Sequence, residues 1–97
     1  MEPRKADIVL STAGRDQGKL FYVIGTEGAY VLIADGKGRP LEHPKRKKLK
    51  HIQRVTRPES HVADKLESGE RVLNSELRRD LAVFRRDHQC LNNQGGS

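Results

Sequence analysis

Three short apolar runs, separated by glycine-containing connections, most constrain the fold of this chain. They occupy residues 7–11, 20–26 and 29–35 and are rich in β-branched and aromatic residues. Runs of this length and composition predict β-strands, and Glu27-Gly28 between the last two predicts a hairpin. The runs are more continuous than strictly alternating, which indicates that both faces of the sheet are partly covered. The sequence therefore predicts a small sheet that is closed or strongly bent.

Two further strands are predicted after this first group. Residues 41–42 are a candidate fourth strand, and residues 51–55 are a candidate fifth. Pro40 and Pro44 suit edges and turns, since proline cannot donate to a sheet ladder. Five short strands within about 50 residues favour a small SH3-like five-stranded barrel, followed by one or two helices. The expected class is mostly β with C-terminal α.

The second half of the chain has helical periodicity. A first helix is predicted up to residue 68, opened by Pro58 or Ser60 and ended by Gly69. A second helix is capped by Asn74 or Ser75 and is expected to fray near residues 88–91. Its apolar stripe has helical spacing and consists of Leu77, Leu81 and Phe84, extendable backwards to Leu73. The stripe favours packing against the barrel, and a partner protein is the alternative.

These patterns divide the chain into four parts. We expect an N-terminal extension over residues 1–6, the barrel over 7–56, a helical extension over 57–90 and a flexible tail over 91–97.

Positive charge is concentrated in one segment. Nine of the nineteen Lys and Arg residues lie between Lys37 and Arg57, where Glu42 is the only acid, so this segment carries +8. The flanking segments are each close to neutral. A concentration of this kind is typical of a surface that binds a polyanion, whereas evenly spread charge would indicate little beyond solubility.

A second group of polar residues lies between the first two predicted strands. Gly14 and Gly18 bracket this loop, and glycine suits a turn that needs positive φ. We expect Asp16 to organise the loop by accepting hydrogen bonds from backbone N–H groups. Arg15 and Lys19 would then project from a rigid tip, which is a good position for contacts to phosphate groups.

The stretch from residue 7 to residue 35 resembles the KOW motif, a strand–loop–strand signature of ribosomal proteins and of a class of transcription factors. The matching features are the strand over residues 8–10, the loop over 14–19, the apolar strand after it, and Gly25. In that family the glycine equivalent to Gly18 is the hallmark. Residues 30–37 and 42–51 extend the resemblance to short bacterial KOW-domain RNA-binding proteins, which are similar to KOW-motif large-subunit ribosomal proteins of archaea and eukaryotes. The resemblance implies an SH3-like barrel that binds structured RNA, most naturally ribosomal RNA.

Charge, loop and resemblance together give a set of candidate residues. If about four to six of the cations meet phosphates, log K should fall with log salt at a slope of roughly −3 to −5. The residues expected to contact RNA are Arg15, Gln17, Lys19, Lys37, Arg39, Lys45, Arg46, Lys47, Lys48, Lys50 and His51, with Gly14, Asp16 and Gly18 shaping the loop. Leu49 and Ile52 are expected to anchor the basic segment on the barrel.

The aromatic residues have a second interpretation, as core filler. Alternation puts Phe21 and Tyr22 on opposite faces, and we expect only Phe21 to be buried. Tyr22 or Tyr30 would then be the better candidate for stacking on an unpaired base.

No reaction is expected from the remaining chemical groups. His88 and Cys90 lack the second pair of ligands that a zinc site needs, and Cys90 is interpreted as an ordinary thiol. We therefore expect no enzymatic activity, no cofactor, no metal and no small-molecule substrate. The single cysteine suits a reducing cytoplasm, and we find neither a signal sequence nor a run that could span a membrane.

The expected function is therefore a cytoplasmic, ribosome-associated RNA-binding protein of the translation machinery. RNA would be the main partner, with ribosomal proteins as possible neighbours. The alternative is a KOW-type protein-interaction module on the transcription or translation machinery, in which the barrel or the helical stripe docks on a protein.

Overall fold

The computed structural model describes the backbone of residues 2–96 and the side chains of residues 2–87. Five strands are followed by two helices, as the sequence predicts. The elements are β1 (Ile8–Ser11), β2 (Leu20–Glu27), β3 (Tyr30–Ala34), β4 (Lys45–Lys48), the short 3₁₀ helix η1 (Leu49–His51), β5 (Ile52–Thr56), α1 (His61–Ser68) and α2 (Asn74–Gly96).

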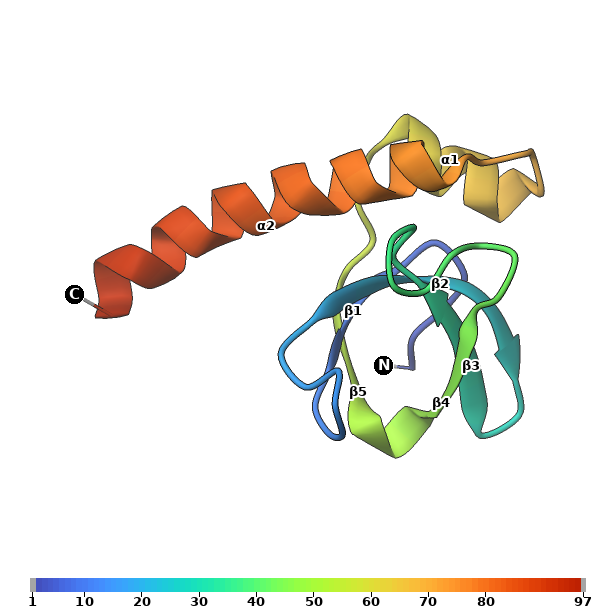
Figure 1. The fold of residues 1–97 in the computed structure, drawn as a ribbon, viewed down its shortest axis with the longest axis horizontal. Coiled ribbons are helices and arrows are strands. Elements are labelled where there is room, and N and C mark those ends of the chain that lie inside the picture. Colours follow the sequence, from blue (N-terminus) through green and yellow to red (C-terminus); the bar gives the residue numbers. More distant parts are fainter. Residues whose placement is uncertain (1, 97) are drawn as a thin grey trace.

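The strands form one antiparallel sheet in the order β4-β3-β2-β1-β5. Two register shifts, one between Val23 and Gly25 and one between Ile8 and Val9, strengthen its curvature. Figure 1 shows the sheet bending until its edge strands β4 and β5 approach each other, with η1 between them. Within residues 2–96 no ladder joins β4 to β5, so the sheet is open. The closed barrel stays a prediction.

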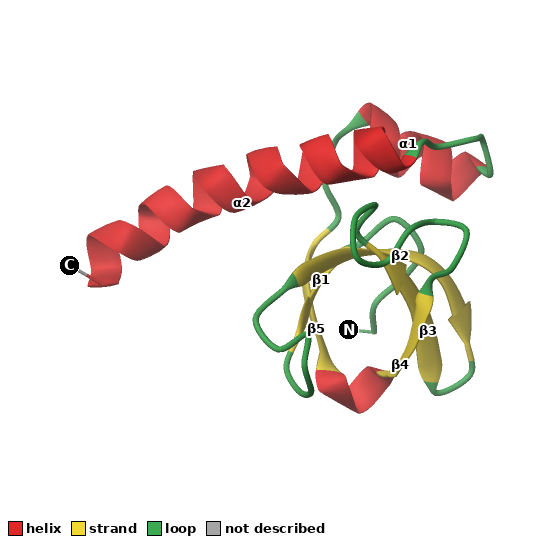
Figure 2. Ribbon diagram, in the orientation of Figure 1, coloured by secondary structure: helices red, strands yellow, loops and turns green. Residues whose placement is uncertain are grey.

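The curved sheet carries a separate apolar core on each face. The inner core consists of Val9, Phe21, Val23, Val31 and Ile33, with Leu49 and Ile52 packed against it. The outer core joins Ile8, Tyr22 and Ala34 of the sheet to residues of both helices. Figure 2 shows α1 and α2 together on this outer side of the sheet. The predicted anchoring of the basic segment by Leu49 and Ile52 is confirmed.

Burial of the paired aromatics differs from the prediction. Phe21 and Tyr22 do point to opposite faces, but both are fully buried. The prediction that only Phe21 is buried was wrong because each face has its own core. The Tyr22 hydroxyl donates to Asp80 of α2 and lies 3.4 Å from Ser60 Oγ. Tyr22 is therefore a structural link to α2 and is not available for stacking on a base.

The fourth strand also lies elsewhere than predicted. Residues 41–42 form a turn, in which His43 N donates to Pro40 O, and the strand is Lys45–Lys48. The two prolines favour a turn over residues 41–43, because proline has no backbone N–H to donate to a strand ladder and its φ is fixed. The predicted fourth strand was too early by a few residues, and the basic residues themselves form the edge strand.

The first helix begins and ends as the sequence predicts, whereas the second begins at Asn74, whose side chain accepts from Leu41 N and donates to Glu42 instead of capping the helix. Ser60 Oγ accepts from Ala63 N at the start of α1, and Gly69 ends that helix in the left-handed conformation. In α2, Leu77 and Leu81 are buried in the outer core and Phe84 packs against it. The stripe does not extend back to Leu73, which is half exposed.

The second helix is longer than expected. It continues to Gly96, beyond the predicted end near residues 88–91, since no proline interrupts it and its glycines come last. It extends past the edge of the sheet (Figure 1). Ser97, the last residue of the predicted tail, lies outside the described residues. Within the described part of the chain, no helix is long and apolar enough to cross a membrane.

Candidate nucleic-acid interface

The β1–β2 loop, residues 12–19, is closed by backbone hydrogen bonds. Gln17 N donates to Gly14 O at 3.2 Å, and Gly18 N donates to Ser11 O at 2.8 Å. Both bracketing glycines have positive φ, +79° at Gly14 and +87° at Gly18, which other residues adopt at a cost. The predicted need for glycine at these two positions is confirmed.

Asp16 stabilises this loop in a way that differs from the prediction. Its Oδ2 accepts from Lys45 Nζ at 2.7 Å, and its carboxylate is almost fully buried. The N–H groups of Thr12, Gln17, Gly18 and Lys19 donate to backbone carbonyls, and the Asp16 carboxylate binds the lysine. The hydrogen bond from Lys45 holds the pKa of Asp16 below its ordinary value of 3.8.

Three contacts fix the loop to the basic segment. Besides the Asp16–Lys45 ion pair, Lys47 Nζ donates to Ala13 O at 2.8 Å. Thr12 N donates to His51 O at 2.9 Å, which ties the beginning of the loop to the end of η1. The two regions that the sequence identified separately therefore form one continuous surface.

Strand alternation divides the cations of β4 between the two faces of the sheet. Lys45 and Lys47 pair with Ile33 and Val31, which point to the inner core. Lys47 is only 8% exposed, and its amine is held by the Ala13 carbonyl. Lys47 therefore stabilises the loop, and its contact with RNA phosphates stays a prediction that its burial does not favour. Lys45 is half-buried and bound to Asp16.

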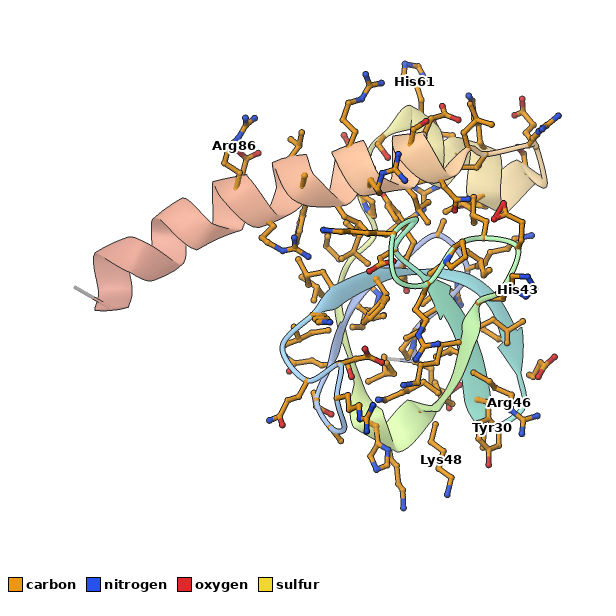
Figure 3. The ribbon with its side chains drawn as sticks, in the orientation of Figure 1. Tyr30, His43, Arg46, Lys48, His61 and Arg86 are labelled. Carbon is orange, nitrogen blue, oxygen red and sulfur yellow. The ribbon has the colours of Figure 1, made fainter. Side chains whose placement is uncertain are left out.

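Arg46 and Lys48 point the other way, to the outer face. They pair with Leu32 and Tyr30, in a part of the sheet that the helices leave uncovered. Figure 3 shows the side chains of Arg46, Lys48 and Tyr30 extending away from the ribbon. Lys50 of η1 is also exposed. Arg15, Gln17 and Lys19 of the β1–β2 loop are exposed as well.

The remaining candidates are less closely connected to this surface. Lys37 and Arg39 lie in the β3–β4 loop, where both backbone N–H groups donate to Asp35 Oδ1. Among the described residues no ion pair joins the Lys37 side chain to the β1–β2 loop. Arg39 is half-buried and close enough to Asp16 to contribute to lowering its pKa. His51 is half-buried in η1.

Several other cations of the basic segment are used inside the fold. Arg54 binds the buried carboxylate of Asp7 at 2.9 Å, and Arg57 binds Glu67 of α1. The +8 of the segment therefore overstates the charge that a ligand would meet. Outside the helical part of the chain, the exposed Lys and Arg residues with no ion pair among the described residues are Arg4, Lys5, Arg15, Lys19, Lys37, Lys48 and Lys50.

Sequence reasoning missed the partner of Arg46. Its guanidinium lies over the Tyr30 ring, 4.5 Å from the centroid, and its ion pair with Glu27 is long at 4.0 Å. Arg46 and Tyr30 form a diagonal cross-strand pair. Such a pair can be predicted from the sequence only when the register of β3 and β4 is known.

Within the described residues no group of three His, Cys, Asp or Glu side chains could hold a metal ion. The side chains of His88 and Cys90 lie outside the described ones. The stripe of α2 that could have docked on a partner packs on the sheet instead.

The sequence matches none of the protein-family profiles and none of the curated proteins to which it was compared. The resemblance to the KOW motif therefore depends on the residues quoted above.

Proposed function

We propose that this chain is a non-catalytic RNA-binding protein of the translation machinery, with structured ribosomal RNA as its ligand. The observation that carries the proposal is the fixed junction between the β1–β2 loop and the basic segment. The Asp16–Lys45, Ala13–Lys47 and Thr12–His51 contacts make one rigid cationic surface. We further propose that the curved sheet is an SH3-like barrel of the KOW type, as the resemblance implies.

Phosphate contacts would supply most of the affinity. Lys and Arg side chains that neutralise phosphates release counterions, and they position a protein without reading sequence. The surface offers Arg15, Lys19, Lys48 and Lys50 for this purpose, and Gln17 as a neutral donor. Recognition would therefore follow the shape of folded RNA. Under this proposal the protein acts in the cytoplasm, beside ribosomal proteins, and needs neither cofactor nor small-molecule substrate.

The test removes charge from the surface without disturbing the fold. A surface variant combines Arg15→Gln, Lys19→Gln, Lys48→Gln and Lys50→Gln, all at exposed positions. A control variant removes the same charge from the helical side, with Arg71→Gln, Arg79→Gln, Arg85→Gln and Arg86→Gln. Binding to folded ribosomal RNA is measured over a salt series, together with cosedimentation with ribosomal subunits.

The wild type and the control variant should give a log–log salt slope of roughly −3 to −5, and the surface variant a slope shallower by about 3. A slope near zero for the wild type, or equal losses in both variants, overturns the proposal. Cosedimentation that survives in the surface variant would favour the alternative, a protein-interaction module.

A further inference from the structure

Tyr30 lies at the tip of the β2–β3 hairpin, beside a hollow that no part of the fold fills. The hollow has a volume of about 430 Å³ and is lined by Ala29, Tyr30, Lys48, Leu49 and Lys50. We call it the Tyr30 hollow. Its size falls within the range of about 300–1,000 Å³ that is typical of small-ligand sites.

The floor of the Tyr30 hollow is apolar and fixed in place. Leu49 packs against the inner core, and its backbone N donates to Ala29 O at 2.9 Å. Arg46 lies over the Tyr30 ring and thereby restricts its rotation. A ligand would meet Tyr30 and Leu49 already ordered, which lowers the entropic cost of binding.

The rim of the hollow is cationic. Lys48 and Lys50 both line it, both are exposed, and no acidic side chain lines it. A flat apolar floor with two ammonium groups at its edge is complementary to an aromatic ring that carries a nearby negative charge. A nucleotide has this combination, with a base that stacks and a phosphate that pairs.

We propose that the Tyr30 hollow binds one unpaired nucleotide of RNA. The base lies against Tyr30 and Leu49, and the phosphate lies between the Lys48 and Lys50 ammonium groups. The inference rests on the proposed function and deepens it, because it adds a site for a single-stranded element to a surface that otherwise contacts phosphates alone. The η1 helix, which carries Lys50, is joined to the β1–β2 loop by the hydrogen bond from Thr12 N to His51 O.

The test compares two RNA probes. One is an RNA hairpin with a single-stranded adenosine tail, and the other is the same hairpin with a blunt end. Tyr30→Ala should weaken binding of the tailed hairpin by about 5- to 150-fold, the range that corresponds to loss of base–aromatic stacking. The blunt hairpin should bind unchanged. Tyr30→Phe, which keeps the ring, should bind both probes like the wild type.

Tyrosine fluorescence reports on the same contact without depending on stability. The chain has two tyrosines and no tryptophan, and Tyr22 is buried. The tailed hairpin should quench the Tyr30 emission of the wild type. In Tyr30→Phe, where only Tyr22 emits, the quenching should disappear. This comparison decides the matter even if Tyr30→Ala fails to fold.

A charge test completes the design. Lys48→Gln with Lys50→Gln should remove the advantage of the tailed hairpin over the blunt one, whereas Arg71→Gln with Arg79→Gln should keep it. If the wild type binds neither hairpin, the proposed function fails. If it binds both equally and Tyr30→Ala changes neither affinity, the Tyr30 hollow is not a nucleotide site, while the proposed function stands.

Discussion

The cations of β4 form two rows, one on each face of the sheet, and the two rows differ in burial and in the groups that they contact. Lys45 and Lys47 point inward, where one binds Asp16 and the other binds the Ala13 carbonyl. Arg46 and Lys48 point outward, into solvent, next to Tyr30. The inner row holds the β1–β2 loop in place, and the outer row is open to a ligand. A run of like charges can thus contain both a structural and a binding set, separated by one position.

This difference changes how the charged segment should be tested. Replacing residues 45–48 all at once would remove the loop's supports together with the exposed cations. A loss of RNA binding in such a variant would not separate a missing contact from a displaced loop. Variants that replace the residues of only one row distinguish a missing contact from a displaced loop.

The largest expected effect comes from Lys47→Ala. It removes a buried side chain and one of the two donors to the Ala13 carbonyl, which keeps only the Ser11 hydroxyl, so the free energy of unfolding should fall by about 2–3 kcal/mol. Lys48→Ala, at the neighbouring exposed position, should change it by less than about 0.5 kcal/mol. Urea unfolding of the two variants measures the contrast.

Lys47→Met serves as the matched control for this pair. It restores the packing of the aliphatic stem but not the hydrogen bond, so its stability should lie between those of Lys47→Ala and the wild type. Equal stability of Lys47→Ala and Lys48→Ala would contradict the division into two rows.

Much of this arrangement could be predicted from local sequence. The first three strands, the glycines of the β1–β2 loop, and the caps Ser60 and Gly69 follow from rules that act over a few residues. The rule for each of them concerns backbone conformation, which neighbouring residues largely determine.

The roles of individual side chains could not be predicted in the same way. Phe21 and Tyr22 are both buried because α2 covers the second face of the sheet. This burial depends on tertiary packing, which a local sequence pattern does not reveal. Lys47 is buried because the register of β3 with β4 places it opposite Val31. A shift of one residue in that register would have exchanged the two rows, and sequence pattern alone does not fix it when every residue is basic.

An intermediate effect is expected for the ion pair of the inner row. Asp16→Asn should lower stability at neutral pH by about 1 kcal/mol, since it removes a charge-assisted hydrogen bond that is mostly shielded from water. The pKa of Asp16 is lower in the folded state than its ordinary value of 3.8. The stabilisation is therefore complete above that value and is lost as pH falls through the lowered pKa.

Thermal melts of the wild type and Asp16→Asn between neutral and acidic pH check this prediction. The difference in melting temperature should shrink as the solution becomes more acidic than the ordinary pKa. Asp64→Asn, at an exposed carboxylate that pairs with Arg57 at 3.5 Å, is the control and should show a smaller difference at neutral pH. A difference for Asp16→Asn that stays constant with pH would show that its carboxylate does not stabilise the loop.

The smallest effect is expected in the outer row. Arg46 and Glu27 are 60% and 53% exposed and 4.0 Å apart, so their ion pair should contribute almost nothing to stability. The contact with the Tyr30 ring should contribute about 0.5–1 kcal/mol, the range for an exposed cation–π pair. Arg46→Gln should therefore lower stability by roughly this amount, and Glu27→Gln should leave it unchanged. A double-mutant cycle with Tyr30→Ala isolates the contact. The double mutant should lose less stability than the two single mutants lose together. If the two losses are additive, the contact between Arg46 and Tyr30 contributes no stability. The outer row then contributes even less to the stability of the fold, compared with the inner row, than the structure indicates.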